Sequence, residues 1–387
     1  MLTGSLSLSL SLPSSHSSRA IQERAAAFRA MAAACGFCLL AVLLLAALSP
    51  RALASAATAV PAKLKAAPAP VVAGPVSRVE DASMFQIYYG QSFKVIKNYG
   101  DGKSYLLMQA KNVQDGIQDQ VLHGIKSFVI PLANFSVDTT TSPDEDKGCN
   151  FAAYVPLEED TPLQRAEWIK YLGTFTNSED RANAVYDAIK RNYLCLSKAA
   201  ANLSTRFKPI VAWIEYTQGM WAFIKENYTL QFVIDAGAEI VDATITNKRF
   251  NSSDPEDMDN FHAILCTVDV VIDQTYALEP AEYKLSTFLD NINVSHDSCF
   301  SFVSNRSIWR FDKRIGASGT LDWYDGAISQ PQLVIRDLIE VFFPTGNYTT
   351  IYFRNLAKEE EVTEIGPEMC TRSISTPMEP IVLPCQL

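Results

Sequence analysis

Histidine is scarce in this chain, and the short motifs of the common enzyme classes are missing. Four histidines occur in 387 residues, and beyond the first 60 residues only the widely separated His123, His262 and His296 remain. No cluster of His, Cys and Asp has the spacing of metal ligands. No G-x-S-x-G, P-loop or G-x-G-x-x-G sequence is present. We therefore expect no catalytic residues, no bound metal and no cofactor.

Positive charge is also in the minority. Lys and Arg number 33 against 43 Asp and Glu, which gives a formal net charge of -10 and a pI near 5.0. Such a chain cannot release phosphate counterions on the scale that nucleic-acid binding needs, and it is not attracted to anionic membranes. The hydrophobic fraction of 48% and the length are enough for one large domain or two smaller ones.

Residues 1–56 are predicted to be a targeting segment with a low-complexity start. A Ser/Leu repeat and several arginines precede an apolar run at residues 37–48, which is short for a membrane span. Ala52-Leu53-Ala54 has the small-x-small pattern of a cleavage site. We expect a cleaved signal peptide and a secreted protein with no stable membrane span; the alternative is an uncleaved signal anchor. Residues 57–80, rich in Ala and Pro, are predicted to be a linker.

Two further patterns favour the secretory pathway. The N-glycosylation sequon is dense in this chain and occurs at Asn134, Asn202, Asn227, Asn251, Asn293, Asn305 and Asn347. The cysteines that remain beyond the targeting segment are even in number, which suits disulfides in an oxidising compartment. These disulfide candidates are Cys149, Cys195, Cys266, Cys299, Cys370 and Cys385. Their pairing stays open, although Cys370 and Cys385 are placed to tie down the end of the chain.

Residues 81–160 are predicted to form an N-terminal lobe that contains β-strands. Short strand-like runs are found at residues 85–89, 93–96, 105–110 and 125–131. The next segment, residues 161–205, has the apolar spacing of a long helix, with a break at residues 173–178. Thr161 and Pro162 are typical of an N-cap and the first helical position. We expect this backbone helix to join two lobes.

Residues 206–344 are predicted to form a C-terminal α/β lobe. Strands are expected at residues 210–216, 240–245, 268–273 and 300–311, and helices at 221–235, 253–265, 280–291 and 330–343. Strands that alternate with helices predict a mainly parallel sheet with right-handed crossovers. Residues 345–387 are a predicted C-terminal tail.

The stretch from Trp168 to Pro344 resembles the class III periplasmic substrate-binding proteins, also called helical-backbone metal receptors. The motifs that carry the resemblance are Ala166-Glu167-Trp168-Ile169-Lys170, Lys208-Pro209-Ile210-Val211-Ala212-Trp213, Asp235-Ala236-Gly237-Ala238, Val268-Asp269-Val270-Val271-Ile272-Asp273, Ile308-Trp309-Arg310-Phe311-Asp312-Lys313, Leu321-Asp322-Trp323-Tyr324-Asp325 and Asp337-Leu338-Ile339-Glu340-Val341-Phe342-Phe343-Pro344. From Asp81 onward the chain also resembles a secretory plant branch of this family. The resemblance implies a two-lobed α/β fold that holds its ligand between the lobes. Bacterial relatives deliver ferric siderophores, haem or cobalamin to ABC importers.

The first lobe departs from the family pattern. The family has several strand–helix pairs before the backbone helix, whereas here only short runs separate Ile130 from Thr161. The segment that would complete the lobe, between about Thr140 and Cys149, normally supplies one wall of the ligand cleft. We therefore expect a shortened first lobe.

Residues near predicted strand ends are candidates for ligand contact, because ligands of open α/β sheets lie outside the carboxyl ends of the strands. The ligand-binding candidates are the aromatic residues Tyr216, Tyr276, Trp323 and Tyr324, together with Arg314 as a partner for an anionic group. The resemblance supports Trp323, since the family often has a cleft tryptophan in this region. The alternative interpretation buries the aromatic residues in the core and pairs the cations with Asp312 or Asp325.

Two functions fit these patterns. The first is a secreted, glycosylated, non-catalytic ligand-binding protein whose partner is a small molecule or a metal chelate. The second is an extracellular protein-interaction module that keeps the fold and has lost the ligand cleft, which the shortened first lobe favours. An enzyme is the least favoured, because acids at strand ends, such as Glu215 and Asp273, more often cap the next helix.

Overall fold

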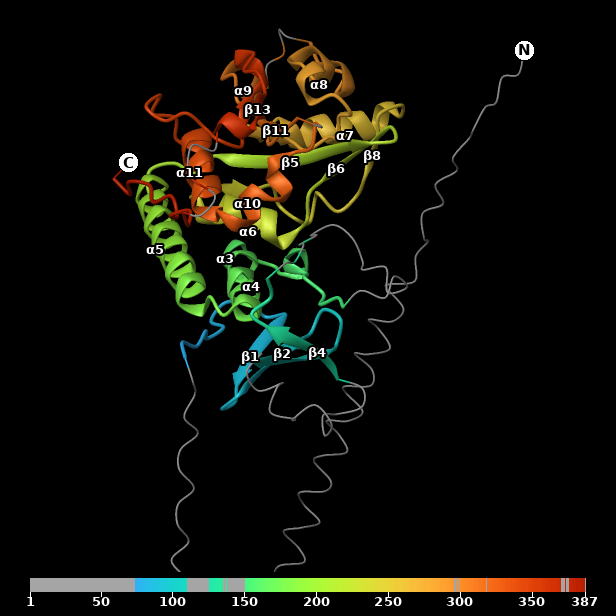
Figure 1. The fold of residues 1–387 in the computed structure, drawn as a ribbon. Helices are drawn as coiled ribbons and strands as arrows, with labels where there is room; N and C mark the ends of the chain where they lie inside the picture. The colour runs from blue at the N-terminus through green and yellow to red at the C-terminus, as the bar shows by residue number, and fades with distance from the viewer. Residues whose placement is uncertain are drawn as a thin grey trace, which may run out of the picture. The chain divides into compact units, whose positions relative to one another are not determined.

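The computed structural model describes residues 74–109, 125–133, 135, 137, 150–295, 298, 300–317, 319–369, 373 and 376–386. These residues belong to one compact unit, which spans residues 68–387. The predicted targeting segment, most of the predicted linker and the stretch at 140–149 lie outside the described residues. The described part combines β-sheets with helices (Figure 1), which confirms the predicted α/β class.

The first sheet has the strand order β1-β2-β3-β4. Its strands are β1 (Phe85–Tyr89), β2 (Phe93–Asn98), β3 (Ser104–Gln109) and β4 (Lys126–Ile130). The first three strands are antiparallel, and β4 runs parallel to β3. One face of this sheet, including Phe85, Ile96 and Tyr105, is buried against Trp168 and Tyr171. The four strands predicted for this lobe are confirmed.

The predicted backbone helix is divided into three. The helices are α3 (Pro162–Ala166), α4 (Trp168–Thr176) and α5 (Glu179–Leu203), and the 3-10 turn η3 (Pro156–Glu158) precedes them. The Thr161 hydroxyl accepts a hydrogen bond from the backbone N–H of Gln164, as expected of an N-cap. Asn177 ends α4 with a left-handed φ of 54°, inside the predicted break. The buried apolar residues of α5 recur at spacings of three and four, which gives one apolar face.

One helix, α5, contacts both sheets. At its start, buried Glu179 pairs with Lys94 of β2, and the Lys94 Nζ also donates to Asn177 Oδ1 at 2.7 Å. Farther along, Tyr193 and Leu196 pack in a core beneath the second sheet. The helix α11 (Pro331–Phe342) lies beside α5 there (Figure 1).

The second sheet has the order β12-β10-β9-β5-β6-β8, and β7 also pairs with β5. Its strands are β5 (Ile210–Thr217), β6 (Met220–Phe223), β7 (Glu239–Ile240), β8 (Phe250–Asn251), β9 (Val270–Asp273), β10 (Ile308–Arg310) and β12 (Arg354–Asn355). The strands β7, β5, β9 and β10 are parallel, as predicted. The strands β6, β8 and β12 add antiparallel edges that the sequence did not predict. A separate parallel pair is formed by β11 (Arg314–Gly316) and β13 (Thr363–Ile365).

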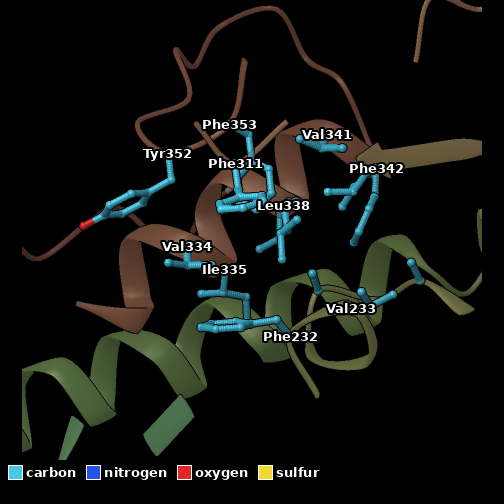
Figure 2. Packing of buried hydrophobic residues seen from close by; sticks show 14 of the residues in the cluster. Phe232, Val233, Phe311, Val334, Ile335, Leu338, Val341, Phe342, Tyr352 and Phe353 are labelled. Carbon is cyan, nitrogen blue, oxygen red and sulfur yellow. The ribbon is translucent and has the colours of Figure 1, made fainter. Parts of the chain in front are cut away.

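Helices cover both faces of the second sheet. They are α6 (Asn227–Asp235), α7 (Pro255–Leu265), α8 (Leu285–Asn291), α9 (Ser301–Ser304), α10 (Gly326–Ser329) and α11, with 3-10 turns η4 (Pro280–Glu282), η5 (Asp322–Tyr324), η6 (Leu356–Lys358) and η7 (Pro367–Met369). Residues of α5, α6 and α11 form one core, and residues of α7 and α8 contribute to the other. Figure 2 shows Leu338 and Ile335 of α11 packed near Phe232 and Val233 of α6, with Phe311 beside them.

The predicted helix at residues 221–235 is wrong in its first part. Gln218 and Gly219 both have positive φ, at 54° and 78°, and they make a two-residue turn between β5 and β6. A turn with positive φ at both positions matches the twist of an antiparallel hairpin. Trp221 and Phe223 are therefore strand residues on one buried face, and the helix starts at Asn227.

The predicted strand at residues 300–311 is also wrong in part. Residues 301–304 form the short helix α9, which buries Phe302. Arg306, with φ 53°, then turns the chain before β10. The predicted strand at 240–245 contracts to the two residues of β7. These apolar runs are short, and a period-two pattern alone does not separate strand from helix over so few residues.

Two buried glutamates hold the segment that precedes β1. The Glu167 carboxylate accepts the backbone N–H groups of residues 80–82 at 2.8, 2.6 and 2.7 Å, and it pairs with Lys170 at 2.7 Å. The Glu159 carboxylate accepts the N–H groups of residues 83–84 at 3.0 and 2.9 Å. Glu167 is 0% exposed and Glu159 is 1% exposed. Buried negative charge is tolerated at these positions because each carboxylate accepts several hydrogen bonds.

Removing the Glu167 carboxylate should strongly destabilise the protein. Glu167→Ala leaves three backbone N–H groups without their acceptor and the buried Lys170 without its carboxylate partner, and a broken buried pair costs about 3–5 kcal/mol. Urea unfolding followed by circular dichroism measures the loss in the free energy of unfolding. The control is Glu158→Ala, an exposed carboxylate of the same region, with an expected change within about 0.5 kcal/mol. Equal effects of the two substitutions would show that the carboxylate does not anchor this segment.

Candidate functional site

The carboxyl ends of β5, β9 and β10 lie along one edge of the second sheet, which is where open α/β sheets bind ligands. Tyr216 is the last but one residue of β5, and Tyr276 lies in the loop after β9. The backbone N–H of Tyr216 donates to Thr275 Oγ1 at 2.9 Å, so these two candidates come from adjoining segments. Tyr216 packs against Trp221 with ring centroids 5.0 Å apart, whereas Tyr276 is 81% exposed.

The other three candidates follow β10. Arg314 is the first residue of β11, and Trp323 and Tyr324 lie in η5. A bridge between Ile315 and Leu321 holds η5 beside β11. The candidates therefore lie in two groups at one edge of the sheet, Tyr216 with Tyr276 and Arg314 with Trp323 and Tyr324. Contacts between the segments of each group hold that group together.

Trp323 belongs to the core. Its side chain is 6% exposed, and its ring centroid lies 5.9 Å from that of Trp213, 5.5 Å from Phe353 and 5.4 Å from Phe311. The position agrees with the alternative interpretation, in which aromatic residues near strand ends are buried. Packing is thus the role that the structure shows for Trp323, and ligand contact stays a prediction.

Tyr324 and Arg314 are on the surface of this turn. Tyr324 is 45% exposed. Partial burial raises its pKa, and the nearby carboxylates of Glu226 and Glu215 raise it further. Arg314 Nε lies 3.4 Å from Asp322 Oδ2, so its partner is an acid of the same turn that the sequence interpretation did not choose. Burial raises the pKa of Asp322 in spite of that neighbouring guanidinium.

The same sheet edge contains a buried network of charges. The Arg310 side chain donates to Asp273 Oδ2 at 2.9 Å, to Asp312 Oδ2 at 2.7 Å and to the Thr275 carbonyl at 2.8 Å. The second arginine, Arg354, donates to Asp312 Oδ1 at 2.6 Å and Oδ2 at 3.1 Å. All four charged residues are at most 1% exposed. Two positive and two negative charges therefore neutralise each other in the interior.

This network accounts for the cations and acids that the sequence left open. Arg310, one of the cations near the end of the predicted strand, pairs with Asp312 as the alternative interpretation has it, but the pair is buried and not at a solvated strand end. Arg354 was not predicted at all, because it lies in a segment interpreted as tail, although Tyr352 and Phe353 just before it are 0% exposed. Its guanidinium also donates to the Pro280 carbonyl at 2.7 Å. The network connects β9, β10, β12 and η4, and it leaves Asp273 and Asp312 engaged as structural acceptors.

A buried acid of α11, Asp337, fixes the loop that carries Tyr352. Its carboxylate accepts the backbone N–H groups of residues 351–353 at 2.8, 2.6 and 3.3 Å, and the Tyr348 hydroxyl at 3.0 Å. Tyr352 packs against Trp323 with ring centroids 6.3 Å apart. Asp337 is fully buried, and this burial raises the pKa of its carboxyl to about 6.

The structure pairs Cys195 of α5 with Cys385. Cys385 does tie down the end of the chain, and its partner lies on the backbone helix. Cys266, another disulfide candidate, is not paired: it follows the last residue of α7, its side chain is exposed and its thiol is free. The remaining candidates Cys149, Cys299 and Cys370 lie outside the described residues.

The sequon asparagines in the described part of the chain are all on the surface. They are Asn202, Asn227, Asn251, Asn293, Asn305 and Asn347, and each is exposed. Asn134 lies outside the described residues. Exposure is the condition that a folded glycoprotein imposes on these positions.

The described residues contain neither a metal-ligand cluster nor a membrane-spanning helix. No group of three or more His, Cys, Asp or Glu side chains is arranged to hold a metal ion in the part of the chain that the structure covers. Within the same residues, no helix combines the length and apolar character needed to cross a membrane.

Comparison with known proteins finds likeness in solved structures alone. No family model matches the chain, and no curated protein matches it. It is similar to an ABC transporter substrate-binding protein from Listeria monocytogenes EGD-e, at 13% identity and a TM-score of 0.32 over 48% of this chain and 65% of that chain. It is also similar to S. aureus IsdE complexed with heme, at 16% identity and a TM-score of 0.33 over 48% of this chain and 66% of that chain. A periplasmic heme binding protein from Pseudomonas aeruginosa matches at 14% identity and a TM-score of 0.35, over 54% of this chain and 68% of that chain.

These matches are solute-binding proteins of the periplasmic type, the class that the sequence motifs resemble. The chain spans 65%, 54% and 53% of three of the matched bacterial chains. What this chain binds therefore rests on its own residues.

The raised pKa of Asp337 predicts how stability changes with pH. Its folded-state pKa of about 6 exceeds the ordinary value of 3.8, so the folded chain binds this proton more tightly than the unfolded chain. The resulting stabilisation is complete below about pH 4 and is lost as the pH rises through 6. Relative to Asp337→Asn, the wild-type free energy of unfolding should fall by about 2 kcal/mol between about pH 4.5 and pH 7.5.

Urea unfolding of both proteins at several pH values measures this difference. A difference that stays flat or rises with pH would mean that the four donors to the Asp337 carboxylate outweigh its burial. Thermal unfolding of the same pair gives an independent check of the direction.

Proposed function

We propose that this chain is a non-catalytic ligand-binding protein whose ligand contacts the carboxyl edge of the second sheet. The observation that carries the proposal is the exposure of Tyr276 (81%) and Tyr324 (45%) at that edge, which also contains a buried network in which the charges pair with one another. Aromatic side chains on a fixed support are suited to binding because little conformational freedom is lost when a ligand stacks on them.

The chemistry of this edge favours a flat ligand with an anionic group. The tyrosine rings offer stacking surfaces, and Arg314 is 27% exposed in its side chain, so its guanidinium is accessible to a carboxylate. Asp322 holds this guanidinium at 3.4 Å, and a ligand carboxylate would compete with that contact. Haem is a suitable test ligand because it is planar and carries two carboxylates.

The acids at this edge support binding over catalysis. Asp273 and Asp312 are 0% exposed and accept hydrogen bonds from arginines, so neither is placed to exchange a proton with a substrate. Asp322 faces Arg314. A general acid or base must contact the reacting group. These carboxylates instead pair with arginines of the protein itself.

Haem binding should depend on the two exposed tyrosines. In the full chain, Tyr276→Ala combined with Tyr324→Ala should weaken haem binding by about tenfold or more, because each stacked ring is worth about 0.5–1.5 kcal/mol. Tryptophan fluorescence quenching and the haem absorbance spectrum measure the dissociation constant. A parallel titration with metal-free protoporphyrin shows whether the ring system alone is recognised.

The matched control is Tyr88→Ala, which removes a tyrosine of similar exposure, 48%, from the first sheet. The affinity of Tyr88→Ala for haem should equal that of the wild type. Equal affinity in all three proteins would assign haem to non-specific surface binding. Absence of binding by either planar ligand would count against a flat anionic ligand, and with it against this proposal.

A protein-interaction role is the second candidate, and a specific surface favours it. Tyr88, Phe93 and Val129 are 48%, 44% and 44% exposed on the face of the first sheet opposite Trp168. Cross-strand pairing places Val95 beside Tyr88, and Met108 between Phe93 and Val129, so the apolar side chains are contiguous. Contiguous apolar surface of this kind marks interaction sites. Binding of a protein partner that Phe93→Ser abolishes and the double tyrosine variant leaves intact would favour this role.

We further propose that the protein is secreted and glycosylated. Exposure of the described sequon asparagines and the Cys195–Cys385 disulfide support an oxidising compartment. After expression in a eukaryotic secretory host, peptide-N-glycosidase should convert these asparagines to aspartate, and peptide mass spectrometry detects the change. Asn177, exposed but outside a sequon, is the control that should stay unmodified. Recovery of all described sequons as unmodified asparagine would contradict the secretory assignment.

A further inference from the structure

The end of the chain is bound along two helices. Residues 376–386, named the strap, are held by Asn192 and Cys195 of α5 and by Gln332 of α11, and these three residues are named the strap site. Nearer the start of α5, Arg181 donates to the Met378 carbonyl and pairs with Glu379. The C-terminus lies beside α5 in Figure 1.

The strap site recognises main chain. The Asn192 amide donates through Nδ2 to the Leu383 carbonyl at 2.8 Å and accepts through Oδ1 the Leu383 N–H at 2.8 Å. This two-way pairing is what a neighbouring β-strand would offer to a single residue. Two residues earlier, the Ile381 carbonyl accepts from Gln332 Nε2 at 3.0 Å. Both amide side chains are buried, with Asn192 3% and Gln332 0% exposed.

The strap leaves part of the site unused. Gln332 Oε1 is buried and has no hydrogen-bond partner among the residues that the structure describes. A buried amide oxygen without a donor is unfavourable, and the strap leaves this one acceptor of the site unused. A peptide N–H is the donor that an extended segment lying on this site would bring.

The side chains of the strap follow an alternating pattern. Leu383 and Cys385 pack against the core beneath the second sheet. Val382 between Ile381 and Leu383 is 62% exposed, and Pro384 is exposed. Apolar side chains at the alternate positions 383 and 385 therefore pack inward, while Ile381 is 41% exposed and the intervening positions are unconstrained.

We propose that the strap site binds extended peptide segments with apolar side chains at alternate positions, through their backbone, and that the strap occupies it in cis while Cys195–Cys385 is closed. The disulfide makes the strap an intramolecular competitor that cannot leave. Release requires a dithiol: its two thiols pass two electrons and two protons to the disulfide, which becomes two cysteine thiols as the dithiol becomes a disulfide.

Binding of a labelled peptide tests this proposal. The probe is a fluorescent peptide with the sequence of residues 376–386 and serine in place of the cysteine, followed by fluorescence anisotropy. The oxidised full chain should not bind it. A full chain with Cys385→Ser should bind, and a chain that ends at residue 375 should bind at least as well because no strap competes. The wild type in excess dithiothreitol should resemble Cys385→Ser.

Two controls separate backbone recognition from non-specific adhesion. In the Cys385→Ser background, Asn192→Ala should weaken the binding of the peptide by about tenfold or more, because two hydrogen bonds are lost. Asn202→Ala, an exposed asparagine on the same helix, should not. A probe with N-methyl leucine at the Leu383 position keeps the side chain, lacks the N–H, and should lose affinity similarly.

Three results would overturn the proposal. They are equal binding by oxidised wild type and Cys385→Ser, binding that is insensitive to both Asn192→Ala and N-methylation, and no binding by the chain that ends at residue 375 when circular dichroism shows that it is folded. None of these outcomes bears on haem binding at the sheet edge, because the strap site shares no residue with it.

Discussion

The carboxyl edge of the second sheet depends on the burial of Asp312 between two arginines. Arg310 and Arg354 both donate to this carboxylate, and Arg310 also reaches Asp273. Isolated charges at this depth would be very costly, so each member requires the others. The four charged residues come from β9, β10, β12 and the loops beside them. Their ion pairs therefore hold the ends of these strands together.

The pairing of these buried charges affects which chemistry the carboxyl edge of the second sheet can support. The buried acids are engaged as hydrogen-bond acceptors, whereas Tyr276 and Tyr324 at the same edge are exposed. Under the proposed function, these exposed rings would contact the ligand, while the buried acids stay paired with arginines. Buried charge is also compensated in the first lobe. Backbone N–H groups donate to Glu167 and Glu159 there, and Lys170 pairs with Glu167.

Prediction from sequence succeeded where the signal was local. The cap at Thr161, the start of α7 after Asp254 and the strands of the first lobe were all found, because capping residues and alternating patterns act over a few positions. It failed at β6, where a Gln-Gly turn made a hairpin out of an apparently helical run. It also missed Arg354 and Asp337, since no neighbour in the chain reveals that a distant acid or loop will be their partner.

The sequence by itself determined the α/β class, the order of most elements and the motifs that resemble periplasmic binding proteins, because these follow from residue type and periodicity. Only the tertiary structure decided which candidates are accessible: Trp323 packs against Trp213, while Tyr324 beside it is half exposed. It also decided that Cys385 bonds to Cys195, 190 positions away in the chain. Burial and long-range pairing arise from the folding of distant segments onto one another, and local patterns do not encode them.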